Sequence, residues 1–322
     1  MQMTDAIAQE STLEAWPELD YHAWRPTYET LHRWTQIVGK IRLTQTPWQL
    51  HSWNATLYVT ARGLTTSPIQ YGPRSFQIDF DFVEHVLLVR TDSGGTRTVP
   101  LKAKSVAEFH TELFAALVSL DVHVRINGRP NEVADPIPFA DDHDHAHYDP
   151  DYVRRFHRVL LSTEHAFNEF KSSFLGKTSP VHFFWGSFDL AVTRFSGRPA
   201  PPHPGGIPNL PDAVTREAYS HEVSSAGFWP GGGPTDYAAF YSYAYPTPPG
   251  YHAATVRPDG AFYHSGAGEF LLPYDTLRKS PKPDAALRAF LETTYAAAAD
   301  AGGWDRRALE CPRGIPRVPR PV

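Results

Sequence analysis

The chain has 322 residues, of which 41% are hydrophobic and 13% aromatic. A chain of this length can bury a large core, and this composition is too apolar for a disordered protein. The formal net charge of -5 is small and is not concentrated in blocks. It therefore argues against nucleic acid or an acidic membrane surface as a partner.

The cysteine content and the N-terminus bear on cellular location. Cys311 is the single cysteine, so no internal disulfide can form and a reducing compartment is suitable. The first twenty residues include Asp5, Glu10 and Glu14 and lack the apolar region of a signal peptide. No window approaches the ~18 apolar residues of a membrane-spanning helix. We therefore expect a soluble, cytoplasmic protein.

Hydrophobic periodicity predicts a helix, four strands and a second helix in the first half. Residues 27–42 follow Pro26 with apolar side chains at helical spacing. Extended runs are expected at 53–61, 75–82, 85–90 and 96–101. A capping box from Ser105 to Glu108 begins a helix that continues through Leu120. These elements form a predicted N-terminal half at residues 16–130.

The same order of elements recurs in the second half. Asp149-Pro150 caps a long helix expected to end at Gly176, and a closing helix is expected at 284–300. Between them lie extended runs at 181–195, 219–229, 239–245, 261–264 and 268–273. This half, residues 149–305, is expected to carry the site. Residues 311–322 lack apolar periodicity and are predicted to be a disordered tail.

The recurring order predicts an α+β fold in which two similar helix–antiparallel-sheet–helix halves share one core. Such a fold would indicate an internal duplication, and WNATLYVTARGL (53–64) is similar to WGSFDLAVTRFSG (185–197). The alternative is that a generic α+β order and a shared aromatic strand match by chance.

Motifs for several common chemistries are absent. The chain has no phosphate-binding glycine loop, no dinucleotide-binding glycine motif and no nucleophile elbow. His221-Glu222 begins like a zinc-protease motif, but position 225 is serine. His143, His145 and His147 alternate and could hold a metal in an extended chain. The alternative is that they are solvated histidines of a polar linker.

Polar side chains interrupt the predicted strand at 181–195. His182 and Asp189 are seven residues apart, roughly 23 Å at ~3.3 Å per residue, so a site must recruit a neighbouring strand. The run at 219–229 supplies His221 and Glu222. We expect His182, His221 and Glu222 to converge as ligands of a divalent transition metal. On a regular strand adjacent residues face opposite ways, so this requires a bulged or turning backbone.

Catalytic roles follow for three residues of these runs. Glu222 could act as a general acid or base without metal, and Asp189 and Arg194 could orient a substrate or clamp an anionic group. The alternative is that His182 is a hydrogen-bonded core histidine and that Asp189 and Arg194 make structural ion pairs.

Aromatic residues lie beside these polar groups. Trp185 and Trp229 belong to the same two runs, and Gly186 in mid-strand indicates a bulge or the close approach of another group. Tyr241 and Tyr243 alternate, so their rings share one side of a strand. Flat rings with polar tips suit a sugar or an aromatic ligand. The alternative is an aromatic sheet core with its hydroxyls at the margin.

Three long blocks carry a family resemblance: SPVHFFWGSFDLAVTRFSGRP, YSHEVSSAGFWPGG and EFLLPYD. They resemble the signature blocks of a bacterial family known only as a domain of unknown function. The resemblance extends from about residue 16 to 310. It implies no activity and assigns no catalytic residue.

Two classes of function remain open. The first is an enzyme with a His/carboxylate centre in an aromatic cleft, acting on a small molecule and able to use a divalent metal. The second is a non-catalytic protein whose aromatic cleft binds a small molecule or a sugar. The sequence leaves the substrate and the oligomeric state open.

Overall fold

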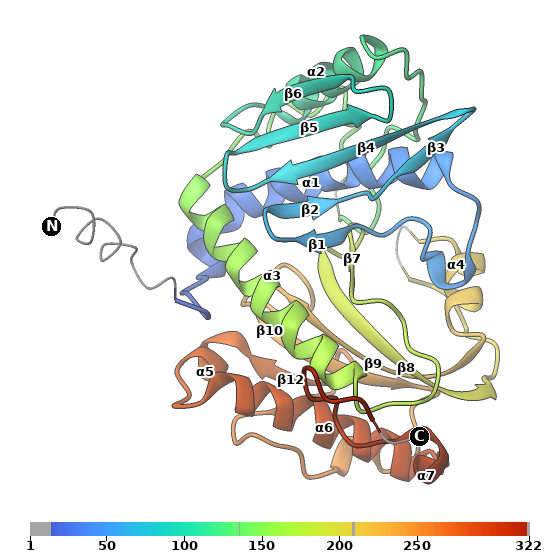
Figure 1. Cartoon of the computed structure of the whole chain (residues 1–322). Helices are drawn as coiled ribbons and strands as arrows, with labels where there is room; N and C mark the ends of the chain where they lie inside the picture. Colours follow the sequence, from blue (N-terminus) through green and yellow to red (C-terminus); the bar gives the residue numbers. More distant parts are fainter. Residues whose placement is uncertain (1–13, 135, 208–209, 321–322) are drawn as a thin grey trace, which may run out of the picture.

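The computed structural model describes residues 14–134, 136–207 and 210–320. It contains two antiparallel sheets with helices packed against them, so the predicted α+β class is confirmed (Figure 1). No helix within these described residues is long and apolar enough to cross a membrane.

The first sheet belongs to the N-terminal half and has the order β1-β2-β4-β5-β6, with β3 also paired to β4. Its strands are β1 (Tyr58–Thr60), β2 (Gly63–Thr65), β3 (Ile69–Tyr71), β4 (Arg74–Asp81), β5 (Val86–Thr91) and β6 (Thr96–Pro100). The predicted run at 53–61 is largely wrong, because only its last residues pair in the sheet. The runs expected at 75–82, 85–90 and 96–101 are close to β4, β5 and β6.

Two helices accompany the first sheet, α1 (Tyr21–Gln45) and α2 (Val106–Val118). They pack on each other through Trp34 and Phe109, whose rings stack with centroids 4.6 Å apart. The predicted capping box at Ser105 and Glu108 is confirmed. α1 begins earlier than expected and contains Pro26 in its second turn, where the proline lacks the N–H that would bond to the preceding turn.

The second sheet has the order β11-β12-β10-β9-β8-β7. Its strands are β7 (His182–Phe184), β8 (Asp189–Pro199), β9 (His221–Trp229), β10 (Ala239–Tyr245), β11 (Phe262–His264) and β12 (Glu269–Pro273). The single strand expected at 181–195 is wrong. The chain reverses at 185–188, where Phe188 has a φ of 57°, so His182 pairs with Ala191 and Phe184 with Asp189.

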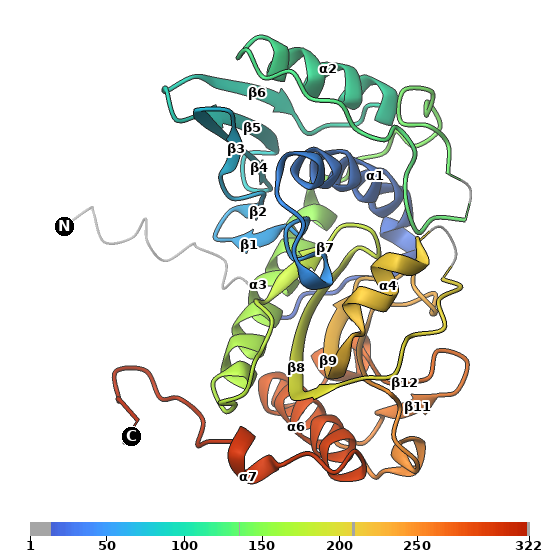
Figure 2. The same cartoon turned by 90° about the vertical axis from the view of Figure 1, so that its right-hand side faces the viewer.

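Helices cover the two faces of the second sheet differently. α3 (Pro150–Lys171) and α6 (Pro283–Ala301) lie on one side of β8 and β9, and α4 (Asp212–Ala218) lies on the other (Figure 2). α3 ends five residues before Gly176, because Ser172 caps it. The short elements η1 (Leu50–Ser52), η2 (Tyr251–Ala253), α5 (Tyr274–Arg278) and α7 (Arg306–Leu309) complete the fold.

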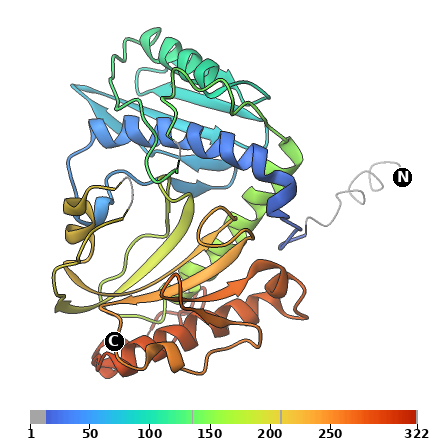
Figure 3. The ribbon, with the colours of Figure 1, turned by 180° about the vertical axis from the view of Figure 1, so that it is seen from behind.

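One hydrophobic core joins both halves. α1 crosses the molecule between the two sheets (Figure 3), where Trp24 contacts Phe156 with ring centroids 5.2 Å apart. The backbones of Leu57 and Phe183 also bridge the two sheets. The shared core is therefore confirmed. The internal duplication stays a prediction.

The C-terminal tail returns to α3. The amide of Cys311 donates to the Ser173 carbonyl at 3.1 Å, and the amide of Gly314 donates to Ser172 Oγ at 3.1 Å. Ile315 and Val318 are exposed. The disordered tail expected at 311–322 stays a prediction, and its last two residues lie outside the described residues.

Candidate functional site

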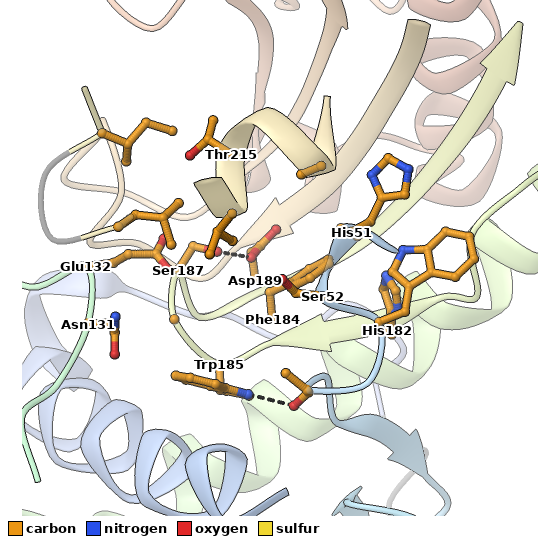
Figure 4. Close-up of a pocket in the computed structure, with 18 of the residues that line it drawn as sticks. His51, Ser52, Asn131, Glu132, His182, Phe184, Trp185, Ser187, Asp189 and Thr215 are labelled. Atoms are coloured by element: carbon orange, nitrogen blue, oxygen red, sulfur yellow. Dashed lines mark hydrogen bonds between the residues drawn. The ribbon is translucent and has the colours of Figure 1, made fainter. Parts of the chain in front are cut away.

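A cavity of about 660 Å³ lies on the face of the second sheet opposite α3 and α6. The sheet forms one wall, and α1, η1, α4 and the loop at 131–132 form the others (Figure 4). This volume is within the range of small-molecule sites. The cavity therefore has room for a ligand of moderate size.

The pairing of β7 with β8 decides which side chains face the cavity. Every second residue of β8 from Asp189 to Phe195 lines it, whereas Leu190 and Val192 are buried on the other face. His182 and Phe184 lie opposite Ala191 and Asp189, and cross-strand partners share a face. The hairpin therefore brings His182 and Asp189 to the same wall.

Small residues on β9 make room for tyrosines from β10. Tyr241 pairs with Gly227 and Tyr243 pairs with Ser225. A Cβ atom at Gly227 would overlap the ring of Tyr241. The ring can therefore lie across β9, and its hydroxyl reaches Asp189 on β8.

Asp189 is the most enclosed acid of the cavity wall, with 4% of the residue exposed. Its carboxylate accepts hydrogen bonds from Ser187 Oγ, at 2.5 Å, and from the hydroxyl of Tyr241. Burial raises the pKa of Asp189 to about 6, although these two hydrogen bonds act in the opposite direction. Asp189 can therefore exchange a proton near neutral pH.

Glu132 is a second acid of the cavity, and the sequence reasoning missed it. Its carboxylate lies directly over Gly186, where a Cβ atom would overlap it. The residue as a whole is exposed, although many protein atoms lie around its carboxyl group. Burial, and then the charge of Asp189, raise the pKa of Glu132 to about 7. The close approach predicted at Gly186 is thus made by Glu132.

Lys40 and Trp185 form the wall next to α1. Gly39 has no side chain, which lets the Trp185 ring rest on the helix, and Trp185 Nε1 donates to the Ala55 carbonyl at 2.7 Å. The ammonium of Lys40 donates to Asn131 Oδ1, and burial lowers the pKa of Lys40 to about 8.

Two histidines face the cavity at the opposite end, His182 from β7 and His51 from η1. Burial is the main cause that lowers the pKa of His182 to about 3 and that of His51 to about 4. His182 Nδ1 lies 3.3 Å from Thr56 Oγ1. Both imidazoles are therefore neutral at physiological pH.

Indole rings provide much of the apolar wall. The ring of Trp229 lies against that of Tyr241, with centroids 4.2 Å apart. Trp53 is close to His182, at 6.1 Å between centroids, and Trp48 lines the cavity near η1. The predicted aromatic residues Trp185, Trp229, Tyr241 and Tyr243 all line the cavity.

Three residues predicted for the site lie elsewhere. Arg194 faces α3 and α6 because it is an odd number of residues from Asp189 on β8, so the two do not form an orienting pair. Its guanidinium stacks on Phe170, 3.4 Å from the ring centroid. Glu222 binds Arg198 at 2.7 Å, and His221 contacts Ser220 Oγ at 3.1 Å beyond the cavity.

The residues present do not fit the predicted metal centre. In the part of the chain that the structure describes, no three His, Cys, Asp or Glu side chains gather to hold a metal ion. Adjacent residues of a strand face opposite sides of the sheet. Glu222 therefore faces away from the β9 side chains that line the cavity. In the 143–147 cluster, His145 Nδ1 contacts the buried carboxylate of Asp142 at 2.9 Å, while His143 and His147 are exposed.

The structure thus brings together His182, Trp185, Asp189, Trp229, Tyr241 and Tyr243. Sequence reasoning missed Lys40, His51, Glu132 and Ser187. Lys40 follows Gly39 in a predicted helix, and Glu132 lies in a loop, so neither carried a signal. Ser187 belongs to the block SPVHFFWGSFDLAVTRFSGRP. A hydrogen bond from its hydroxyl to Asp189, two residues further on, could have been predicted.

The fold and the cavity define an α+β protein with a half-open pocket that is lined by aromatic residues and contains two carboxyl groups of raised pKa. The chain belongs to DUF5996, a family of unknown function whose model matches residues 16–311. No curated protein and no solved structure matches the chain.

Proposed function

We propose that the cavity is the active site of an enzyme that transfers a proton on a small molecule, with Asp189 as the acid–base group. The observation that carries this proposal is the position of Asp189. It is a buried carboxyl group facing a ligand-sized cavity, with its pKa raised to about 6. Buried acids with a pKa near the working pH are favoured as general acids and bases.

The neighbouring side chains support this role. Ser187 and Tyr241 hold the Asp189 carboxylate in one orientation through their hydroxyls. The second carboxyl group, Glu132, has its pKa raised to about 7, so at neutral pH one acid can be ionised while the other keeps its proton. The tryptophan and tyrosine rings would hold the apolar body of the substrate.

The proposed reaction uses no metal step, because the described residues do not offer a ligand set. His182 and His51 are neutral imidazoles and can accept or donate a hydrogen bond to the substrate. Arg194 and Glu222 have no role in this proposal, since other protein groups hold them outside the cavity.

Comparative metabolite profiling tests the proposal. The purified protein is incubated with a cell extract, and the small molecules consumed and formed are measured by mass spectrometry. We expect the wild type to convert at least one compound, and D189N to slow that conversion by about 10²-fold or more. D259N is the matched control, because Asp259 has a side chain that is 97% exposed.

A non-catalytic binding protein is the second candidate. The concentration of indole and phenol rings around the cavity favours it, since such walls bind flat ligands without chemistry. Mass spectrometry of compounds that co-purify with the protein, combined with the profiling above, distinguishes the two candidates. A compound that co-purifies with the wild type but is returned unchanged would contradict the enzyme and support the binding protein.

A further inference from the structure

The acids at one end of the cavity lack a positive partner in the described part of the chain. The hydrogen bonds to Asp189 come from the neutral hydroxyls of Ser187 and Tyr241. Glu132 lies over Gly186 in the same region, and its charge and that of Asp189 repel each other. A buried carboxylate without a counter-charge is costly, so a bound cation would be favourable here.

Lys40 does not supply that counter-charge. Its ammonium is bound to the amide oxygen of Asn131, and burial alone accounts for its lowered pKa, with no contribution from a carboxylate. Glu269 on β12 adds a third acid behind the tyrosine wall: burial and the charge of Asp189 raise its pKa to about 8. At neutral pH Glu269 is mostly protonated, so Asp189 and Glu132 are the acids that would face a bound cation. The ammonium of Lys40 lies over the Trp185 ring, 5.7 Å from its centroid.

The walls next to these acids are aromatic. Trp229 and Tyr241 lie side by side near Asp189, and Trp185 lies two residues before Ser187 on the chain reversal. Ring faces attract cations, and this attraction is strongest where water is excluded. An acid combined with indole and phenol rings suits an ammonium group attached to a flat apolar body.

Polar side chains on α4 and η1 also lie at the cavity wall. Thr215 on α4 lines the cavity with 1% of the residue exposed, and its Oγ1 has no hydrogen-bond partner among the residues described (Figure 4). His51 is 9% exposed; its ring interacts with the backbone of Ala218, although no hydrogen bond of good geometry reaches its Nε2 there. Buried polar atoms of this kind are uncommon unless something else satisfies them. Both atoms lie beneath the cavity wall and have almost no accessible surface of their own.

From this arrangement we propose that the cavity binds an organic amine: a protonated nitrogen that contacts Asp189 and Glu132, carried on a flat apolar body that lies against Trp229, Tyr241 and Trp185. This inference rests on the cavity being the functional site, but it does not require turnover there. It names the charge and the shape of the ligand, which the proposed function leaves open.

A charge series tests the inference. Tryptamine, tryptophol and indole-3-propionate share an indole ring and differ in carrying a cation, a neutral hydroxyl or an anion. Isothermal titration at neutral pH should give a dissociation constant for tryptamine at least about tenfold below that of tryptophol, with indole-3-propionate the weakest. D189N should remove the advantage of tryptamine over tryptophol, and D259N should keep it.

Two outcomes would overturn the inference: indole-3-propionate binding as tightly as tryptamine, or the absence of binding by all three compounds. If D189N does not fold, as judged by circular dichroism, E132Q provides the second variant, and it should reduce the tryptamine preference. Binding of tryptamine that depends on Asp189, without any conversion in metabolite profiling, would support the amine site and contradict the enzyme. Conversion of a substrate in metabolite profiling, together with no preference for tryptamine in the titrations, would support the enzyme and contradict the amine site.

Discussion

At the scale of single residues, the chemistry of the cavity depends on how few charges surround Asp189. The carboxylate accepts hydrogen bonds from two hydroxyls, and its charge raises the pKa values of two nearby acids, Glu132 and Glu269. Such an arrangement keeps a proton available near neutral pH at the cost of stability, because ionising an unpaired buried carboxyl group opposes folding. We therefore expect Asp189 to destabilise the folded protein when it is ionised.

This leads to a prediction for the D189N variant. The pKa of Asp189 is about 6 in the folded protein, above its ordinary value of 3.8, so the folded state binds this proton more tightly than the unfolded state. The contribution of this proton to the free energy of unfolding is fully present below the ordinary pKa and is lost as the pH rises through about 6. Asparagine avoids this loss, so D189N should stabilise the protein by on the order of 2 kcal/mol at about pH 8, and by less at about pH 5.

Urea denaturation at the two pH values checks this prediction. Removing the charge of Asp189 also relieves Glu132 and Glu269, whose pKa values it raises, so these neighbours add to the effect in the same direction. D259N is the control and should leave stability unchanged at both pH values, since Asp259 is exposed. A D189N protein less stable than the wild type at about pH 8 would mean that Asp189 has a stabilising partner.

At the scale of elements, period-two alternation is what makes one wall of the cavity. It was enough to place Tyr241 and Tyr243 on one face and to select Trp229 and His182 from neighbouring runs. It could not find the reversal at 185–188, because Gly186 was interpreted as a bulge and the residue with the left-handed backbone, Phe188, is neither glycine nor asparagine. The sequence therefore misplaced Asp189 relative to His182 while identifying both.

The match of small and large residues across β9 and β10 gives a prediction for the element scale. Replacing Gly227 with alanine puts a Cβ atom into the ring of Tyr241, whose backbone pairs with Gly227. We expect G227A to lose about 1–3 kcal/mol of stability and to separate the Tyr241 hydroxyl from Asp189. Ligand binding should fall with it.

The control for this substitution is G128A. Gly128 has no atom within contact range of an added Cβ, so its replacement should change neither stability nor binding. Chemical denaturation and titration of the charge series on both variants provide the measurement. Full stability of G227A would show that the Tyr241 ring can move aside without cost.

At the scale of the whole molecule, the cavity belongs to neither half alone. The cavity takes Lys40, His51 and Glu132 from the part of the chain before residue 149. It takes His182 and Asp189 from the part after it. The sequence predicted the second-half residues because polar and aromatic side chains stand out within apolar, strand-like runs. The others lie in a helix, a 3₁₀ turn and a loop, where no local periodicity indicates which long-range neighbour they will meet.

The same long-range packing predicts that the two halves cannot be separated. α1 is held by the second half at several points: Trp24 Nε1 donates to the Pro230 carbonyl at 3.3 Å, and the rings of Tyr28 and Phe188 are 5.0 Å apart. Just before α1, Trp16 Nε1 donates to Asp284 Oδ1 at 2.8 Å. Residues 149–305 expressed alone would expose the apolar surface that α1 covers, and a domain that loses part of its core loses cooperative folding.

Limited proteolysis and expression of fragments test this prediction together. Cleavage near residue 143 should leave the two pieces associated on size-exclusion chromatography, because the core crosses the cut. The fragment 149–305 alone should lack a cooperative thermal transition, whereas co-expression with residues 14–142 should restore both the transition and ligand binding. A fragment 149–305 that unfolds cooperatively and binds tryptamine by itself would contradict the shared core and would assign the site to the second half.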